Sequence, residues 1–283
     1  MTETTAERTR SWQPVDPNRG RDLVDARLQL HHAAQLATAF GISYLAAQAD
    51  DSHTNLEWIE SIGALASKSA GSPAVRVAVR PNALAILILD ANANVTATYL
   101  LDGRTISDAA EWIRGQLTER GFDAARYTLK RHYQIPTHAL DSGAAFRASQ
   151  PALFGELARW YSNAAATLEQ FASVTPNAAP VRCWPHHFDI ATIVEVAQGK
   201  TVGLGMEPGD EYWQEPYFYT NMYPSPNADV PRPELGGNGL WNTRDWVGAV
   251  LPSSRLGTTN QHVQVDDFIR TAVSACKRIL LGG

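Results

Sequence analysis

"AVRVAVRPNALAILILDANANVTATYLL", residues 74–101, is the stretch that indicates how the chain folds. It contains three short runs of β-prone residues, separated by the turn signals "PN" and "ANAN". The middle run, "ALAILILD", is apolar on both faces, so we expect it to form an inner strand. Consecutive strands joined by short turns predict an antiparallel meander.

Helical patterns flank this meander. Good helix formers with apolar residues near one face predict helices at 25–47 and at 106–119, the second of them capped by Ser107. Longer apolar stripes predict two further helices, at 151–173 and 265–281. The sequence therefore predicts a few long helices beside the strands.

The second half of the chain repeats the β-rich pattern. Strands are predicted at 181–184, 189–197 and 200–206, followed by aromatic-rich loops as far as about residue 250. One more strand and a turn are predicted within 127–140. Because strands and helices come in groups without strict alternation, the predicted class is α+β, with antiparallel sheets packed against helices.

The domain organisation follows from composition. Residues 1–21 are rich in Thr, Arg and Pro, which predicts an N-terminal tail, and residues 22–283 are expected to form a single α+β domain. An alternative stays open, in which segments of about 50–125 and 180–283 are two related halves that arose by duplication.

Composition and charge exclude several classes of protein. The chain has 24 Lys and Arg against 29 Asp and Glu, a formal net charge of −5, and no stripe dense in basic residues, so nucleic acid is not an expected partner. Two cysteines cannot build a disulfide framework, and no apolar run approaches the roughly 18 residues of a membrane span. We expect a soluble cytoplasmic protein without a membrane partner.

The segment "VRCWPHHFDIA", residues 181–191, suggests a metal site. On a strand, His187 and Asp189 would project to the same face, and His262 is available as a third ligand. Two histidines and a carboxylate with open positions suit non-haem Fe(II), and the pattern loosely resembles that of 2-oxoglutarate-dependent oxygenases. A divalent metal is therefore the one cofactor suggested. The alternatives are a metal-free polar pocket, or an Asp189 that only caps a turn.

Acidic and aromatic residues crowd together at 206–226. We expect Glu207, Trp213, Tyr219 and Tyr223 to bind a ligand, because such side chains on loops often line clefts. A loop that merely covers the end of a sheet is an equally good interpretation. Three loop tryptophans, at 213, 241 and 246, also allow a protein contact such as a homodimer.

The helix at 25–47 contains "LHHAAQ", residues 30–35. His31 and Gln35 are four residues apart and share a helix face, so both could reach one buried polar partner. A histidine buried in the core with its hydrogen bonds satisfied is the commoner meaning of such a residue.

The order of "LHHAAQ", "SHTNLEW", "FDIA" and "FYTNMYPSP" resembles a bacterial domain-of-unknown-function family with LHxxxQ, His-Trp, FDLA and FYxxxYPxP motifs. The resemblance covers residues 28–226, and it implies no activity because the family has none assigned. It implies a shared set of polar residues: His31, Gln35, His53, Asp189, Tyr219 and Tyr223.

These candidates define two classes of function. In the first, Asp189 is a general base, and His31 or His53 carries the proton, in an enzyme that acts on a small polar molecule. A second version of this hypothesis is a metal enzyme that uses His187, Asp189 and His262. In the second class, the same pocket only binds a ligand, or the aromatic stretch forms a protein interface.

Overall fold

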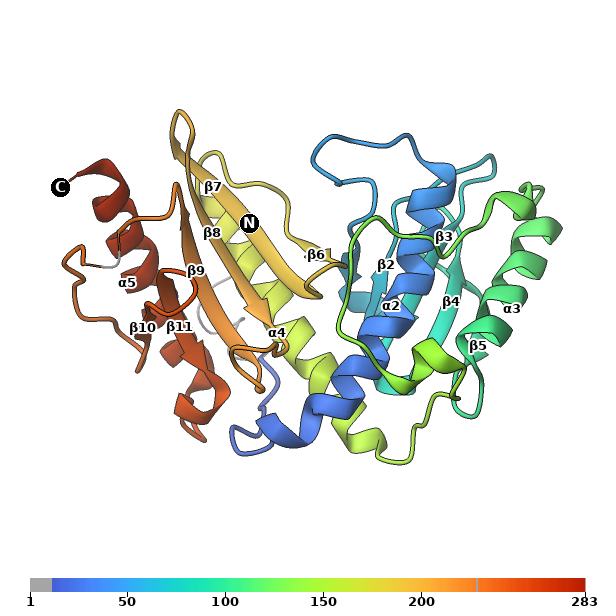
Figure 1. The fold of residues 1–283 in the computed structure, drawn as a ribbon, viewed down its shortest axis with the longest axis horizontal. Coiled ribbons are helices and arrows are strands. Elements are labelled where there is room, and N and C mark those ends of the chain that lie inside the picture. Colours follow the sequence, from blue (N-terminus) through green and yellow to red (C-terminus); the bar gives the residue numbers. More distant parts are fainter. Residues whose placement is uncertain (1–11, 228, 283) are drawn as a thin grey trace. The chain divides into compact units, whose positions relative to one another are not determined.

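A computed structural model of the protein describes residues 12–227 and 229–282. Within them, four α-helices and two antiparallel sheets form an α+β fold, as the sequence predicts (Figure 1). The described residues group into two compact units. Unit 1 takes those of Met1–Val24, Arg159–Val181 and Asp189–Gly283, and unit 2 takes Asp25–Ala158 and Arg182–Phe188. The prediction of a single domain at 22–283 stays a prediction, and so does the alternative of two related halves.

Unit 2 contains a five-stranded meander whose spatial order is its chain order. Its strands are β1 (Glu57–Ile59), β2 (Ala64–Ala66), β3 (Arg76–Arg80), β4 (Ala85–Leu89) and β5 (Val95–Leu100). The antiparallel meander predicted at 74–101 is confirmed, and every residue of β4 is buried, as expected of an inner strand. The three-residue strands β1 and β2 were not predicted, because they are too short to show a period.

Two helices belong largely to unit 2: α2 (Val24–Tyr44) and α3 (Ile106–Glu119). The prediction that Ser107 caps α3 is wrong. Thr105 is the cap, since its hydroxyl accepts from the Asp108 backbone N–H while the Asp108 carboxylate accepts from the Thr105 backbone N–H. The strand predicted within 127–140 is also wrong: these residues form no strand, and a short 3-10 helix begins at Ala139.

The six-stranded sheet has the order β10-β11-β9-β8-β7-β6. Its strands are β6 (Arg182–Trp184), β7 (Asp189–Ala197), β8 (Lys200–Glu207), β9 (Tyr217–Tyr223), β10 (Leu240–Asn242) and β11 (Gly248–Pro252). The residues of β6 group with unit 2 and those of the other five strands with unit 1. The prediction of aromatic-rich loops as far as about residue 250 is partly wrong, because β9 carries most of the "FYTNMYPSP" motif as a strand.

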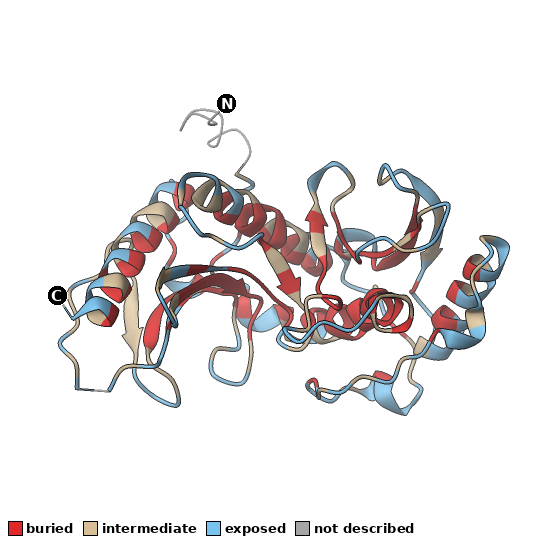
Figure 2. Ribbon diagram, turned by 90° about the horizontal axis from the view of Figure 1, so that it is seen from above, coloured by how far each residue is buried: buried red, intermediate tan, exposed pale blue. Residues whose placement is uncertain are grey.

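Helices α4 (Pro151–Val174) and α5 (Gln261–Leu281) contact one face of this sheet in unit 1. The ring of Trp160 on α4 lies 6.2 Å from that of Phe218, and Thr220 Oγ1 lies 3.4 Å from Cys276 Sγ on α5. Phe218 and Thr220 are two apart on β9, so both helices cover the same face. Figure 2 shows burial concentrated on the strands and on parts of the helices, and residues 29–41 of α2 are all buried.

The described start of the chain is fastened to unit 1. The backbone N–H of Val15 donates to Gln261 Oε1 at 3.0 Å, and Gln261 Nε2 donates to the Val15 carbonyl at 2.8 Å. Of the tail predicted at 1–21, residues 1–11 lie outside the described residues. No helix in the described ranges combines the length and hydropathy that crossing a membrane demands.

Candidate functional site

The sheet face opposite α4 and α5 carries a group of carboxylates and phenols, which we call the sheet-face cluster: Asp189, Glu207, Asp210, Tyr217 and Tyr219. Register explains how it forms. Ile190 pairs with Met206, which puts Asp189 opposite Glu207, and Glu207 pairs with Tyr217. The side chains of Asp189, Glu207 and Tyr217 therefore stand in a row across the same sheet face. Asp189 and Glu207 are only 6% and 5% exposed, which is unusual for carboxylates.

A short hydrogen bond joins two members of this cluster. The Tyr219 hydroxyl donates to Asp189 Oδ2 at 2.5 Å. Burial, and after it the negative charge of Asp189, raises the pKa of Tyr219 well above its ordinary value. Tyr219 is therefore a neutral phenol near pH 7, and its O–H fixes the orientation of the Asp189 carboxylate.

A glycine makes this contact geometrically possible. Gly205 on β8 pairs with Tyr219 and lies between β7 and β9. An added Cβ at Gly205 would lie 2.7 Å from Cε1, Cζ and the hydroxyl oxygen of Tyr219. The hydroxyl end of the phenol lies directly over Gly205, and the hydroxyl reaches across β8 to Asp189 on β7.

A second phenol is held by the loop after β8. The Tyr217 hydroxyl donates to Asp210 Oδ2 at 2.6 Å, while Asp210 Oδ1 accepts from the backbone N–H groups of Tyr212 and Trp213 at 2.8 Å each. Burial raises the pKa of Tyr217, and the charges of Glu207 and Asp210 act in the same direction. Tyr217 is thus also a neutral donor.

Aromatic rings continue from these phenols. Ring centroids are 6.3 Å apart for Trp213 and Tyr217, 6.2 Å for Tyr217 and Tyr219, and 6.5 Å for Tyr219 and Trp246. Tyr223 projects from the same side of β9 as Tyr219, but it is 69% exposed. Flat apolar rings thus border the hydrogen-bonding groups, a mixture typical of ligand sites.

Changing Gly205 to alanine should separate Tyr219 from Asp189. The new methyl group would overlap the phenol, and such overpacking costs about 1–3 kcal/mol of unfolding free energy. Urea denaturation of the Gly205→Ala variant measures this loss. Gly115→Ala is the control: its Cβ meets no atom within 4 Å on helix α3, so a gain of about 0.5–1 kcal/mol is expected. Equal stability of Gly205→Ala and the unmodified protein would contradict the described packing.

In unit 2, His31 and Gln35 bind the same atom. His31 Nε2 and Gln35 Nε2 both donate to the carbonyl oxygen of Pro185, at 2.8 and 2.9 Å, so the shared buried partner predicted from their spacing is confirmed. The His31 ring stacks on Phe188 at 5.0 Å. Burial lowers the pKa of His31 to about 3, and the bond to Pro185 opposes this only partly. His31 is therefore uncharged at neutral pH.

The segment that supplies Pro185 is a turn. Residues 185–188 connect β6 to β7, and Phe188 has a positive φ of 71°. The inference that His187 and Asp189 share a strand face is wrong, because His187 is an exposed turn residue and β7 begins at Asp189. Within residues 12–227 and 229–282, no three His, Cys, Asp or Glu side chains are placed to hold a metal ion.

The remaining predicted residues have separate surroundings. His53 is buried, and its Nδ1 accepts from the Gln48 backbone N–H at 3.2 Å in unit 2. His262 is buried near the start of α5 in unit 1. The prediction that His31 and His53 share a hollow with Asp189 joins residues of different units, and it stays a prediction.

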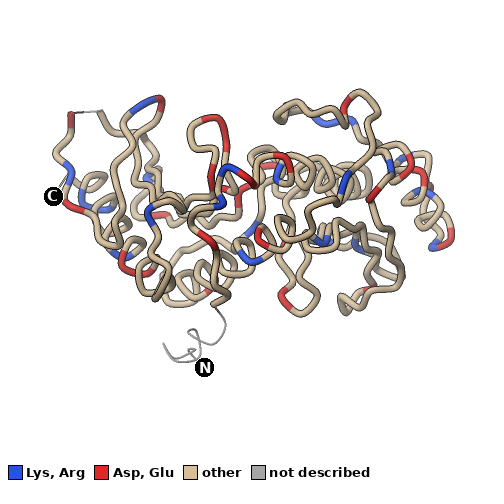
Figure 3. The backbone as a smooth tube through the Cα atoms, turned by 90° about the horizontal axis from the view of Figure 1, so that it is seen from below, with Lys and Arg blue, Asp and Glu red and all other residues tan. Residues whose placement is uncertain are grey.

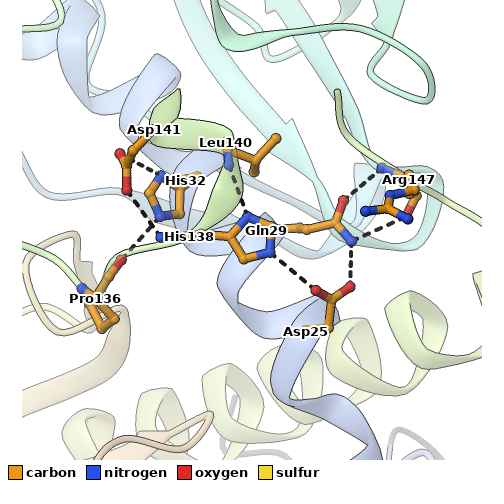
Figure 4. Close-up of polar contacts among 8 residues, drawn as sticks. All are labelled: Asp25, Gln29, His32, Pro136, His138, Leu140, Asp141 and Arg147. Atoms are coloured by element: carbon orange, nitrogen blue, oxygen red, sulfur yellow. Dashed lines mark hydrogen bonds and ion pairs between the residues drawn. The ribbon is translucent and has the colours of Figure 1, made fainter. Parts of the chain in front are cut away.

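A network of histidines and carboxylates in unit 2 was not predicted (Figure 4). His32 is almost fully buried; its Nε2 donates to the Pro136 carbonyl at 3.1 Å, and its Nδ1 lies 3.5 Å from Asp141 Oδ1. Burial lowers the pKa of His32, although the negative charge of Asp141 acts in the opposite direction. His32 thus ties α2 to the segment around residues 136–141.

His138 completes this network. Its Nε2 donates to Asp25 Oδ1 at 3.1 Å, and its Nδ1 accepts from the Leu140 backbone N–H at 3.3 Å. Gln29 donates to Asp25 Oδ2 at 2.8 Å and accepts from the Arg147 backbone N–H at 2.7 Å (Figure 4). Both ring nitrogens of His138 are used in these bonds, so the network fastens the loop around residues 138–147 to α2.

The comparisons with known proteins identify no relative. No protein-family model, curated protein or solved structure matches the chain. The resemblance to the bacterial family with the FYxxxYPxP motif stays a prediction.

Proposed function

We propose that the sheet-face cluster of unit 1 binds a small polar molecule and that Asp189 accepts a proton from it. The hydrogen bond from Tyr219 to Asp189 carries this proposal. It couples a carboxylate that is 6% exposed to a phenol that keeps its proton at neutral pH. A buried carboxylate held in one orientation is suited to act as a general base.

The roles of the two residues differ. Asp189 takes an O–H or N–H proton from the bound molecule. Tyr219 is a positioning residue, because its O–H donates to Oδ2 and holds the carboxylate in place. Because its pKa is raised, Tyr219 keeps its own proton at neutral pH, and a protonated phenol does not compete with Asp189 for the proton of the bound molecule.

The surrounding groups support binding of a polar molecule with a flat or apolar part. Glu207, beside Asp189 in the row across the sheet, and Asp210 supply acceptors in the same cluster. The rings of Trp213 and Trp246 border it on two sides and provide apolar contact area. A few polar groups among aromatic rings are the usual composition of a small-molecule site.

A ligand screen tests the proposal. Thermal-shift measurements against polyols, amino acids, organic acids and nucleosides identify a compound that raises the melting temperature, and calorimetry gives its Kd. In the Tyr219→Phe variant, we expect that Kd to rise by about tenfold, which corresponds to about 1.4 kcal/mol, because Asp189 loses the donor that holds its carboxylate in position for the compound. The control is Tyr223→Phe, which removes a hydroxyl from an exposed ring on the same side of β9.

Asp189→Asn separates catalysis from binding. An amide keeps the shape of the side chain but cannot take the proton, so turnover of the bound compound should stop while binding persists. If Tyr219→Phe and Tyr223→Phe bind the compound equally well, the sheet-face cluster is not the site. Binding without turnover by the unmodified protein would leave a binding role and remove the enzymatic one.

A further inference from the structure

A groove of about 790 Å³ lies between the last turns of α4 and the length of α5 in unit 1. Its apolar lining residues are Phe171 and Val174 of α4 with Ile269, Val273 and Leu281 of α5. This volume lies within the range of about 300–1,000 Å³ found for small-molecule sites. The groove is on the helices, whereas the sheet-face cluster is on the opposite face of the sheet.

The floor and the rim of the groove differ in exposure. Ile269 and Val273 are each 5% exposed and form its floor, while Val174 and Leu281 are 62% and 56% exposed at its edge. Exposed Val and Leu side chains beside a hollow leave apolar surface in contact with water. Covering that surface with an alkyl or aryl group would be favourable, because it removes apolar surface from water.

The charged residues of the groove are mostly basic. Arg270, Lys277 and Arg278 line it together with a single acidic residue, Asp266. Figure 3 shows basic positions along the helix that ends near the C-terminus. Lys277 and Arg278 are about one turn from Leu281, so positive charge and exposed apolar surface meet at the same end of α5.

We propose that this groove binds an amphipathic anion, a molecule with an alkyl or aryl part and a carboxylate or sulfonate group. The apolar part covers Val174, Ile269 and Val273, and the anionic group pairs with Lys277 and Arg278. Charge complementarity favours this occupant over a second copy of the chain. A second copy seated on this groove through the same surface would bring a second set of basic residues to it, and like charges across an interface are unfavourable.

The test uses 8-anilinonaphthalene-1-sulfonate, which carries both features and fluoresces when bound, with decanoate as competitor. We expect saturable fluorescence that decanoate displaces and that decylamine, of the same length but cationic, does not. The double change Lys277→Glu and Arg278→Glu should raise the Kd by at least about tenfold, which corresponds to about 1.4 kcal/mol. Val174→Glu should act in the same direction, because it puts a carboxylate at the apolar edge.

Two controls leave the groove intact. Val263→Glu changes an exposed residue of α5 that does not line the groove, and Arg244→Glu reverses an exposed charge on a loop. Both should bind the probe as the unmodified protein does, and melting curves verify that every variant is folded. Equal Kd values for groove variants and controls would overturn the proposal. So would light scattering that shows a dimer which Val174→Glu dissociates, since a second copy would then occupy the groove.

Discussion

Replacing His31 by glutamine is expected to remove about 3 kcal/mol of the destabilisation that the protein undergoes between pH 6.5 and pH 4. The pKa of His31 is lowered by burial from 6.5 to about 3. A shift of one pKa unit corresponds to about 1.4 kcal/mol of differential interaction. A glutamine side chain can still donate to the Pro185 carbonyl, so the change removes the titration and keeps a hydrogen bond.

The sign follows from proton uptake. Below pH 6.5 the unfolded chain protonates His31 and the folded chain does not, so the unfolded state binds more protons and stability falls as pH falls. The stability that comes from keeping His31 neutral and buried is fully present above pH 6.5. It is lost progressively as the pH falls to about 3. His186, whose pKa is lowered to about 4 mainly by burial, contributes in the same direction.

Urea denaturation at half-unit steps from pH 7.5 to pH 4 measures the effect as a difference between the two proteins. The slope of unfolding free energy against pH should be smaller in His31→Gln by up to about 1.4 kcal/mol per pH unit in the middle of this window. Carboxylates titrate alike in both proteins and cancel in the difference. Parallel curves would show that His31 does not lie buried and neutral beneath Pro185.

Trp160→Ala should cost about 3–5 kcal/mol of unfolding free energy, the range for large buried aromatic residues. Trp160 is 1% exposed on α4, and its ring contacts Phe218 on the helix-covered face of β9. Truncation removes that contact and leaves a cavity, since α4 can collapse onto the sheet only partly. The urea midpoint of the variant gives the loss.

Trp112→Ala is the matched control for Trp160→Ala. Trp112 is half-buried and stacks on Tyr99 in unit 2, with centroids 5.0 Å apart, so less apolar surface is lost on truncation. We expect a cost well below that of Trp160→Ala. If both variants lose the same free energy, Trp160 does not fill the space between α4 and β9.

The fold class could be predicted because local patterns carry it. The run at 85–89 is apolar throughout and is flanked by turn residues, and this is sufficient to place an inner strand. The failures have local causes too. β10 has three residues and lies among Pro and Gly, so neither period nor length distinguishes it from a loop. Thr105 and Ser107 are both good caps by composition, and only the reciprocal bond with Asp108 decides between them.

The candidate site was only partly predictable. His31 and Gln35 share a partner because helical spacing alone places them on one face. Asp189 and Tyr219 are thirty positions apart and meet only through the register of β7, β8 and β9, which no local pattern encodes. The glycine at position 205 inside a strand was the available signal, since such a glycine often marks a close approach by another group.

The chain leaves unit 2 after Ala158 and contributes to it again at Arg182–Phe188, and this affects how fragments of the protein can be designed. A fragment that ends at Ala158 would contain the whole five-stranded meander and yet lack Arg182–Phe188. Leu56 would lose both backbone bonds to Cys183, and His31 and Gln35 would lose the Pro185 oxygen as acceptor. A gene truncated after Ala158 should therefore yield an insoluble or loosened product, whereas a fragment to which residues 182–188 are joined through a linker should fold.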